Sequence, residues 1–117
     1  MNKRRLTITM QSDWKGALRA AGKLAKAKTY QGEVLNFESP GQFFGQLTEK
    51  RWAVVSACQG KGERSVRELA RALGRDVKRV HEDVVMLADL GLVERTESGG
   101  VFCTFGSMHI DMYLEAA

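Results

Sequence analysis

The segment from residue 65 to residue 105 alternates capping residues, apolar stripes and turn residues in an order that few folds accommodate. Ser65, with Glu68 three positions later, is typical of an N-terminal capping box. Gly74 suits the left-handed residue that ends many helices, and Asp76 can cap a second helix directly afterwards. The pattern therefore predicts two helices, over 65–73 and 76–90, joined by a tight turn.

Apolar spacing and turn chemistry extend this pattern into a β-hairpin. The second helix carries a stripe at steps of three and four that should be buried, formed by Val77, Val80, Val84 and Leu87. The β-prone stretches 93–96 and 101–105 flank turn residues at 97–100. Two helices followed by a hairpin form a winged helix-turn-helix, which holds its second helix for entry into the DNA major groove.

The exposed face of the second predicted helix carries charged side chains near its N-terminus. In DNA-binding helices such residues reach base edges or phosphates, where Arg and Lys suit guanine and Glu can accept from cytosine. We expect DNA contacts from this face, the preceding turn, the start of the first helix and the hairpin: Lys78, Arg79, His81, Glu82, Arg75, Ser65, Arg67 and Arg95. Charge alone would favour an ordinary solvated face, but the capping residues and the hairpin favour DNA binding.

Charged residues are unevenly distributed along the chain, which has a formal net charge of +4. Residues 1–30 hold eight Lys or Arg and one Asp, whereas residues 83–117 hold one Arg and six acidic residues. A basic N-terminal part and an acidic C-terminal part fit a protein that turns one side toward a polyanion such as double-stranded DNA. The alternative interpretation is that these charges only keep the protein soluble.

The rest of the chain predicts an α+β fold with extensions at both ends of the winged helix-turn-helix. Further helices are expected over 13–28, 40–46 and 48–59, and further strands over 6–10, 33–37 and 109–114. Phe43, Phe44 and Leu47 should be buried by the short helix. We expect an N-terminal strand-helix-strand arm over 1–38, for dimerisation or partner binding, and a DNA-binding domain that includes the C-terminal strand over 39–117.

The terminal elements predict a homodimer. The helix over 13–28 has a thin apolar stripe, and the strand over 109–114 has an apolar face and open backbone edges, which are a liability unless something covers them. Two-fold pairing would cover both and set two recognition helices roughly 34–36 Å apart on a palindromic site. The alternative is a monomer whose terminal strands pair within the chain.

Other classes of function find little support in the sequence. Cys58 and Cys103 are the only two cysteines, which predicts buried free thiols in a reducing cytosol, and with isolated His81 and His109 they provide no metal site. There is no glycine-rich phosphate loop, no nucleophile elbow and no paired carboxylate with a His in a plausible arrangement, so we expect neither an enzyme nor a cofactor. No apolar run is long enough for a bilayer and no secretory signal is visible, which predicts a cytoplasmic protein without membrane contact.

At this point the sequence resembles a group of predicted transcriptional regulators with a MarR-like winged helix. The resemblance covers about residues 40–114 and, more loosely, the N-terminal strand and helix. The segments that carry it, in matching order and spacing, are Leu47-Thr48-Glu49-Lys50-Arg51-Trp52, Ser65-Val66-Arg67-Glu68-Leu69-Ala70, Gly74-Arg75-Asp76-Val77-Lys78-Arg79-Val80-His81, Leu90-Gly91-Leu92-Val93-Glu94 and His109-Ile110-Asp111.

The resemblance implies sequence-specific DNA binding, usually as a dimer. Members of this group are also similar to antitoxins, which implies a repressor that binds a cognate toxin protein. Two departures bear on affinity: Glu82 stands where a basic residue is common, and the hairpin tip at 97–100 lacks Lys and Arg. The alternative function is a winged-helix module that docks a partner protein without specific DNA binding.

Overall fold

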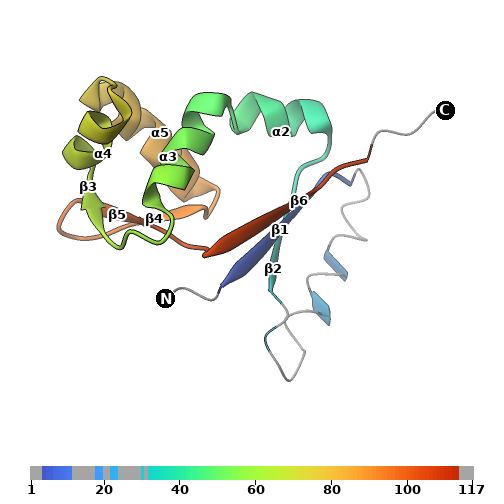
Figure 1. The fold of residues 1–117 in the computed structure, drawn as a ribbon. Helices are drawn as coiled ribbons and strands as arrows, with labels where there is room; N and C mark the ends of the chain where they lie inside the picture. Colours follow the sequence, from blue (N-terminus) through green and yellow to red (C-terminus); the bar gives the residue numbers. More distant parts are fainter. Residues whose placement is uncertain (1–3, 12–17, 20–21, 24–29, 31, 114–117) are drawn as a thin grey trace. The chain divides into compact units, whose positions relative to one another are not determined.

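The structure is a computed structural model that describes residues 4–11, 18–19, 22–23, 30 and 32–113 (Figure 1). Within those residues the fold is α+β, with four helices and two three-stranded sheets. Contacts divide the chain into two units. The first unit runs from Leu47 to Gly106, and the second combines Arg4–Gln46 with the segment that begins at Ser107. This division differs from the predicted boundary at residue 39, because the last strand groups with the N-terminal strands.

The first unit contains three helices and the strands around them: α3 (Glu49–Cys58), β3 (Arg64–Ser65), α4 (Val66–Leu73), α5 (Val77–Asp89), β4 (Val93–Arg95) and β5 (Gly100–Cys103). Side chains cap all three helices, as Thr48, Ser65 and Asp76 each accept a hydrogen bond from the backbone N–H three residues later. Gly74 ends α4 with φ of +64°, in the left-handed region that favours glycine. These local signals confirm the predicted positions of the helices.

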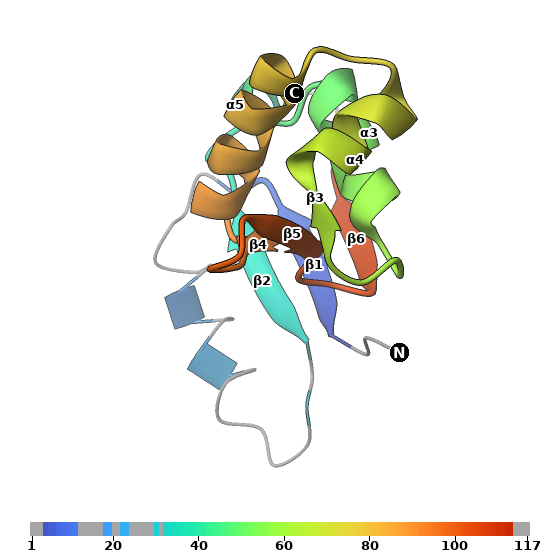
Figure 2. The same cartoon turned by 90° about the vertical axis from the view of Figure 1, so that its left-hand side faces the viewer.

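Strands of the first unit form an antiparallel sheet in the order β3-β5-β4. The hairpin between β4 and β5 was predicted, but β3 was not, since it has only two residues and pairs with β5 far along the chain. The three helices pack against one another and contact the sheet (Figure 2). Their shared core contains Val54, Leu69, Val80, Val84, Leu87, Leu92 and Val101, each with no exposed surface.

One member of the predicted stripe on α5 does not join this core. The side chain of Val77 is 44% exposed, whereas Val80, Val84 and Leu87 are fully buried. Val77 is the first residue of α5, one turn before the buried part of the stripe. The prediction that all four would be buried was therefore wrong at the helix N-terminus.

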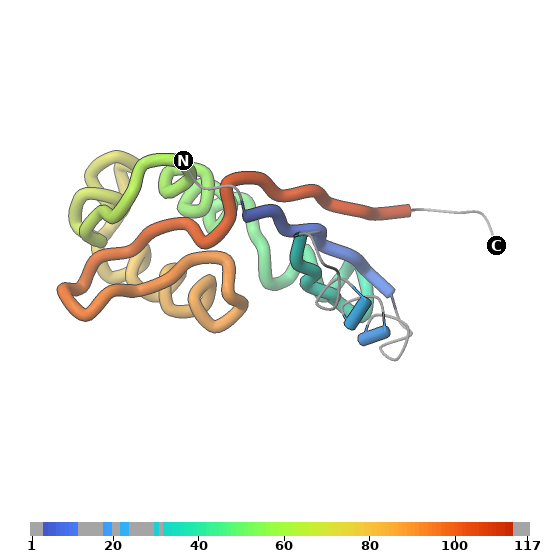
Figure 3. Tube along the Cα trace, turned by 90° about the horizontal axis from the view of Figure 1, so that it is seen from below, coloured from blue at the N-terminus to red at the C-terminus, as the bar shows by residue number. Residues whose placement is uncertain are grey.

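The second unit contains a parallel sheet and a short helix: β1 (Arg5–Thr9), β2 (Glu33–Asn36), α2 (Pro40–Gln46) and β6 (Ser107–Asp111). Its strand order is β2-β1-β6, so the C-terminal strand lies along the N-terminal one (Figure 3). In this register Ile8 pairs with both Leu35 and Ile110. The last strand thus joins the N-terminal strands within the chain, which was one of the predicted possibilities.

Aromatic residues of the second unit differ in burial. Phe37 and Phe43 are each 3% exposed and meet edge to face, with ring centroids 5.5 Å apart. Phe44 is 58% exposed, so the prediction that it would be buried was wrong.

Helical residues occur at 18–19 and 22–23, but the rest of the helix predicted over 13–28 lies outside the described residues. No described helix has both the length and the apolar character to cross a membrane.

Candidate functional site

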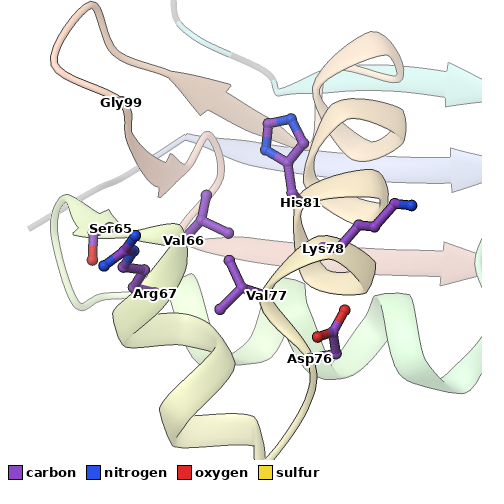
Figure 4. A pocket seen from close by; sticks show the side chains of 8 residues that line it. All are labelled: Ser65, Val66, Arg67, Asp76, Val77, Lys78, His81 and Gly99. Atoms are coloured by element: carbon purple, nitrogen blue, oxygen red, sulfur yellow. The ribbon is translucent and has the colours of Figure 1, made fainter.

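An open groove of about 670 Å³ lies in the first unit, where α4 and α5 begin beside the tip of the β4–β5 hairpin (Figure 4). Its lining combines charged, polar and apolar residues: Ser65, Val66, Arg67, Asp76, Val77, Lys78, His81 and Gly99. Val66 and Val77 lie between the starts of the two helices. The groove therefore gathers several predicted DNA-contacting residues around an apolar floor that was not predicted.

The N-termini of both helices open toward this groove because their caps lie in its lining. The Ser65 hydroxyl accepts from the Glu68 N–H at 3.1 Å and donates to the Glu68 carboxylate at 3.2 Å. The Asp76 carboxylate accepts from the Arg79 N–H at 3.3 Å. Helix N-termini carry a partial positive charge that attracts anions. The Ser65 hydroxyl thus caps α4, as the predicted capping box requires, and its expected contact with a DNA phosphate stays a prediction.

The hairpin tip is held by hydrogen bonds to the segment that precedes β3. Gly99, with φ of +86°, closes the turn, and its N–H donates to the Thr96 carbonyl at 3.0 Å. The Glu63 carboxylate accepts a short hydrogen bond from the Thr96 hydroxyl and another from the Ser98 hydroxyl at 2.9 Å. These two bonds, that of Thr96 first, hold the pKa of Glu63 below its ordinary value of 4.5. Glu63 therefore joins the hairpin tip to the segment before β3.

Arg75 lies in the turn between α4 and α5 and takes part in an ion-pair network with Asp83. Its Nη2 is 2.8 Å from Oδ2 of Asp83, a charge contact without hydrogen-bond geometry, and Nε of Arg51 donates to Oδ1 at 3.2 Å. The side chains of Asp83 and Arg75 are 13% and 19% exposed. The guanidinium predicted to contact phosphate is thus turned toward α5, where it joins the turn to the helix.

The other predicted site residues lie on the outer surface of the first unit. Lys78 and His81 are exposed on α5 and line the groove, although Lys78 points away from the two valines in Figure 4. Arg79 and Glu82 are exposed and loosely paired, with 3.7 Å between Nη1 and Oε2. Arg67 is exposed at the start of α4, and Arg95 is exposed on β4 but does not line the groove.

Sequence reasoning missed the apolar floor of the groove and the acidic anchor of the hairpin. Val77 looked like a core residue because its spacing fits the buried stripe of α5. Val66 is half-buried at the start of α4, where the spacing of apolar residues does not tell a residue that lines the groove from one that lies in the core. Glu63 contacts residues more than thirty positions away, a separation that no local motif reveals.

Metal and thiol chemistry is not indicated in the described residues. No cluster of three or more His, Cys, Asp or Glu side chains is present there that could hold a metal ion. Cys58 and Cys103 are free and buried. Burial, with a smaller contribution from nearby Cys103, raises the pKa of Cys58 to about 11, and burial also raises the pKa of Cys103. Both thiols therefore stay protonated near neutral pH and lack the thiolate that a nucleophile needs.

Comparison with protein families matches residues 46–110 to the HVO_A0114 family, and the chain belongs to that family. The matched range includes α3, α4, α5, the β4–β5 hairpin and most of β6. The whole groove therefore lies inside the matched range. A comparison with curated proteins gives no match.

Proposed function

We propose that this chain is a sequence-specific DNA-binding transcriptional regulator. In this proposal α4 and α5 form a helix-turn-helix, the β4–β5 hairpin is its wing, and α5 enters the major groove. The observation that carries the proposal is the groove in which both helix N-termini and the hairpin tip meet basic side chains. The MarR-like resemblance of the sequence supports the same arrangement.

The chemistry of the groove suits a DNA duplex. Arg67 and Lys78 are exposed cations next to helix N-termini, where phosphate oxygens are stabilised by charge and by free N–H groups. Arg79 and His81 lie on the first two turns of α5, the part of a recognition helix that reaches base edges. Val77, exposed beside them, is an apolar side chain of the kind that contacts the thymine methyl group. The groove and the adjoining first turns of α5 can thus contribute both affinity and sequence discrimination.

In the same proposal the protein acts in the cytoplasm as a repressor, and as a homodimer that binds a palindromic site. The resemblance to antitoxins adds a cognate toxin protein as a further partner. Arg95 on β4 is the basic residue with which the wing would reach the adjacent backbone. Arg75 would act indirectly, because its pairing with Asp83 holds the turn against α5.

A protein-docking module is the second candidate, and one observation favours it. Val66 and Val77 place apolar surface at the floor of an open groove, and the acidic Glu97 lies at the hairpin tip. Apolar surface with a charged rim is typical of protein interfaces. In this alternative a partner helix or loop would occupy the groove in place of a DNA backbone.

Selection of bound duplexes from a random DNA pool tests the first candidate against the second. The full chain should enrich one sequence and bind it at least about a thousandfold more tightly than a scrambled duplex at physiological salt. Fluorescence anisotropy at two salt concentrations should show weaker binding at the higher salt, since phosphate contacts release counterions. Equal affinity for the selected and scrambled duplexes would contradict sequence-specific binding and favour the docking module.

A further inference from the structure

The strand β6 lies at one edge of the parallel sheet of the second unit. Its inner side pairs with β1, and among the described strands none pairs with its outer side (Figure 3). Apolar side chains remain accessible here: Ile110 is 42% exposed and Met112 is 37% exposed. Free strand edges with apolar residues are surfaces to which another strand can add.

Side chains along this edge alternate in chemistry with a period of two. Met108 and Ile110 share one face, the face on which Leu6 and Ile8 of β1 also lie, and Met112 follows directly after the last residue of β6, where the alternation would place it on that face. His109 and Asp111 share the opposite face, beside Thr7 and Thr9 of β1. Alternation of this kind specifies register, because a slip by one residue would bring apolar side chains against polar ones.

We propose that β6 pairs antiparallel with β6 of a second copy of this chain, on a two-fold axis that passes through Ile110. In this register His109 of each copy lies opposite Asp111 of the other, and Met108 lies opposite Met112. Ile110 lies opposite its own copy. In both His–Asp pairs an imidazole faces a carboxylate that it can hydrogen-bond, and all three apolar pairs match, so the edge is self-complementary in the way that a two-fold interface requires.

Other ways of pairing the edges fit less well. In a continuous sheet paired residues lie on the same face, so the axis must pass through a residue and not between two. An axis at Asp111 would place the two Asp111 carboxylates together, and an axis at His109 would leave Asp111 opposite Ser107. The outer edge of β2, with which none of the described strands pairs, fits less well, because an axis at Val34 sets Glu33 against Leu35.

Such pairing would join the two parallel sheets into one six-stranded sheet in the order β2-β1-β6-β6-β1-β2. It rests on the homodimer of the proposed function and deepens it, because it names the surface and the register that hold the two copies together. The test uses the protein without DNA, so failure of the dimer seam and failure of DNA binding give separate results.

Engineered cysteines test the register directly. Residues directly opposite each other on antiparallel strands have Cα atoms about 4.5–5.5 Å apart, within the range of a disulfide. Ile110→Cys should therefore form an intermolecular disulfide under mild oxidation. Met108→Cys is the matched control, since its own copy would lie about 13 Å away along the strand. Mixing Met108→Cys with Met112→Cys should form a mixed disulfide that neither variant forms alone.

A charge swap tests the same seam without oxidation. His109→Asp would set Asp against Asp in two symmetric places and should raise the dimer dissociation constant by about tenfold in sedimentation equilibrium. His109→Asp combined with Asp111→His exchanges the partners and should restore the original constant. A monomer mass for the unmodified chain at high micromolar concentration would overturn the proposal. Equal cross-linking by Met108→Cys and Ile110→Cys, or a swap that restores nothing, would overturn the register.

Discussion

Replacing Asp83 with Asn would remove the carboxylate that bridges Arg51 and Arg75 in the first unit. The ion pair with Arg75 has a 2.8 Å contact, and the hydrogen bond from Arg51 is 3.2 Å long. The Asp83 side chain is only 13% exposed, so water could reach the two arginines only poorly once the carboxylate is removed. The neighbouring guanidinium of Arg75, 19% exposed, would remain partly buried without the carboxylate.

The magnitude follows from this burial. Removing one partner of a fully buried ion pair costs about 3–5 kcal/mol. Because the arginines keep 19% and 26% of their surface in contact with solvent, we expect the lower end of that range, about 3 kcal/mol. Urea unfolding monitored by circular dichroism should therefore show a lower midpoint with an unchanged slope. The loss is a large fraction of the free energy of unfolding of an ordinary domain, about 5–15 kcal/mol.

Glu82→Gln is the matched control, since it makes the same carboxylate-to-amide change one residue away. Glu82 and its partner Arg79 are 52% and 73% exposed and 3.7 Å apart, so the variant should lose at most about 1 kcal/mol. A third variant, Arg75→Ala, combined with Asp83→Asn completes a double-mutant cycle. If Asp83→Asn costs no more than Glu82→Gln, or if the cycle shows no coupling with Arg75, the network does not stabilise the fold as argued.

Three further predictions concern the groove, the turn and the thiols. Arg67→Ala should weaken binding to selected and scrambled duplexes alike and reduce the salt slope by about one, whereas a loss confined to the selected duplex would mean a base contact. Gly74→Ala should cost about 1–2 kcal/mol in thermal unfolding because of its positive φ of +64°, whereas Gly45→Ala, inside α2 with nothing within 4 Å of its new Cβ, should not destabilise. A thiol reagent at pH 8 should label the native protein slowly and the denatured protein fast. A native protein labelled as fast as the denatured one would contradict the burial of the thiols. Because the pKa of Cys58 is raised from 9.0 to about 11, ionisation of this thiol should leave the free energy of unfolding unchanged below pH 9 and lower it between pH 9 and pH 11.

The helices of the first unit could be predicted because their signals are local. The N-cap side chains at Thr48, Ser65 and Asp76 bond to N–H groups three residues away, and Gly74 acts through its own φ. Such contacts depend on neighbours in sequence, so a reader of the sequence has all the information that they require. The hairpin after α5 was predicted for the same reason, from the turn residues between its two strands.

Features that depend on distant partners were missed or misplaced. The two residues of β3 form a strand only because β5 lies beside them. Arg75 turns inward only because Asp83, on the helix that follows, pairs with it. Val77 keeps the spacing of a core residue but starts its helix, where the core ends. The pairing of β6 with β1 was one of several predicted possibilities, and only the three-dimensional arrangement chooses among them.

The central claim, that the first turns of α5 read DNA, is tested most directly by Lys78→Ala combined with Arg79→Ala. Lys50→Ala combined with Arg71→Ala is the control, because it removes the same charge from exposed positions on α3 and α4. Anisotropy titrations of the selected duplex at one salt concentration would compare both with the unmodified chain. We predict that the α5 variant loses about tenfold or more in affinity for the selected duplex while the control loses less. Affinity that falls equally in the two variants, or in neither, would contradict a recognition role for α5.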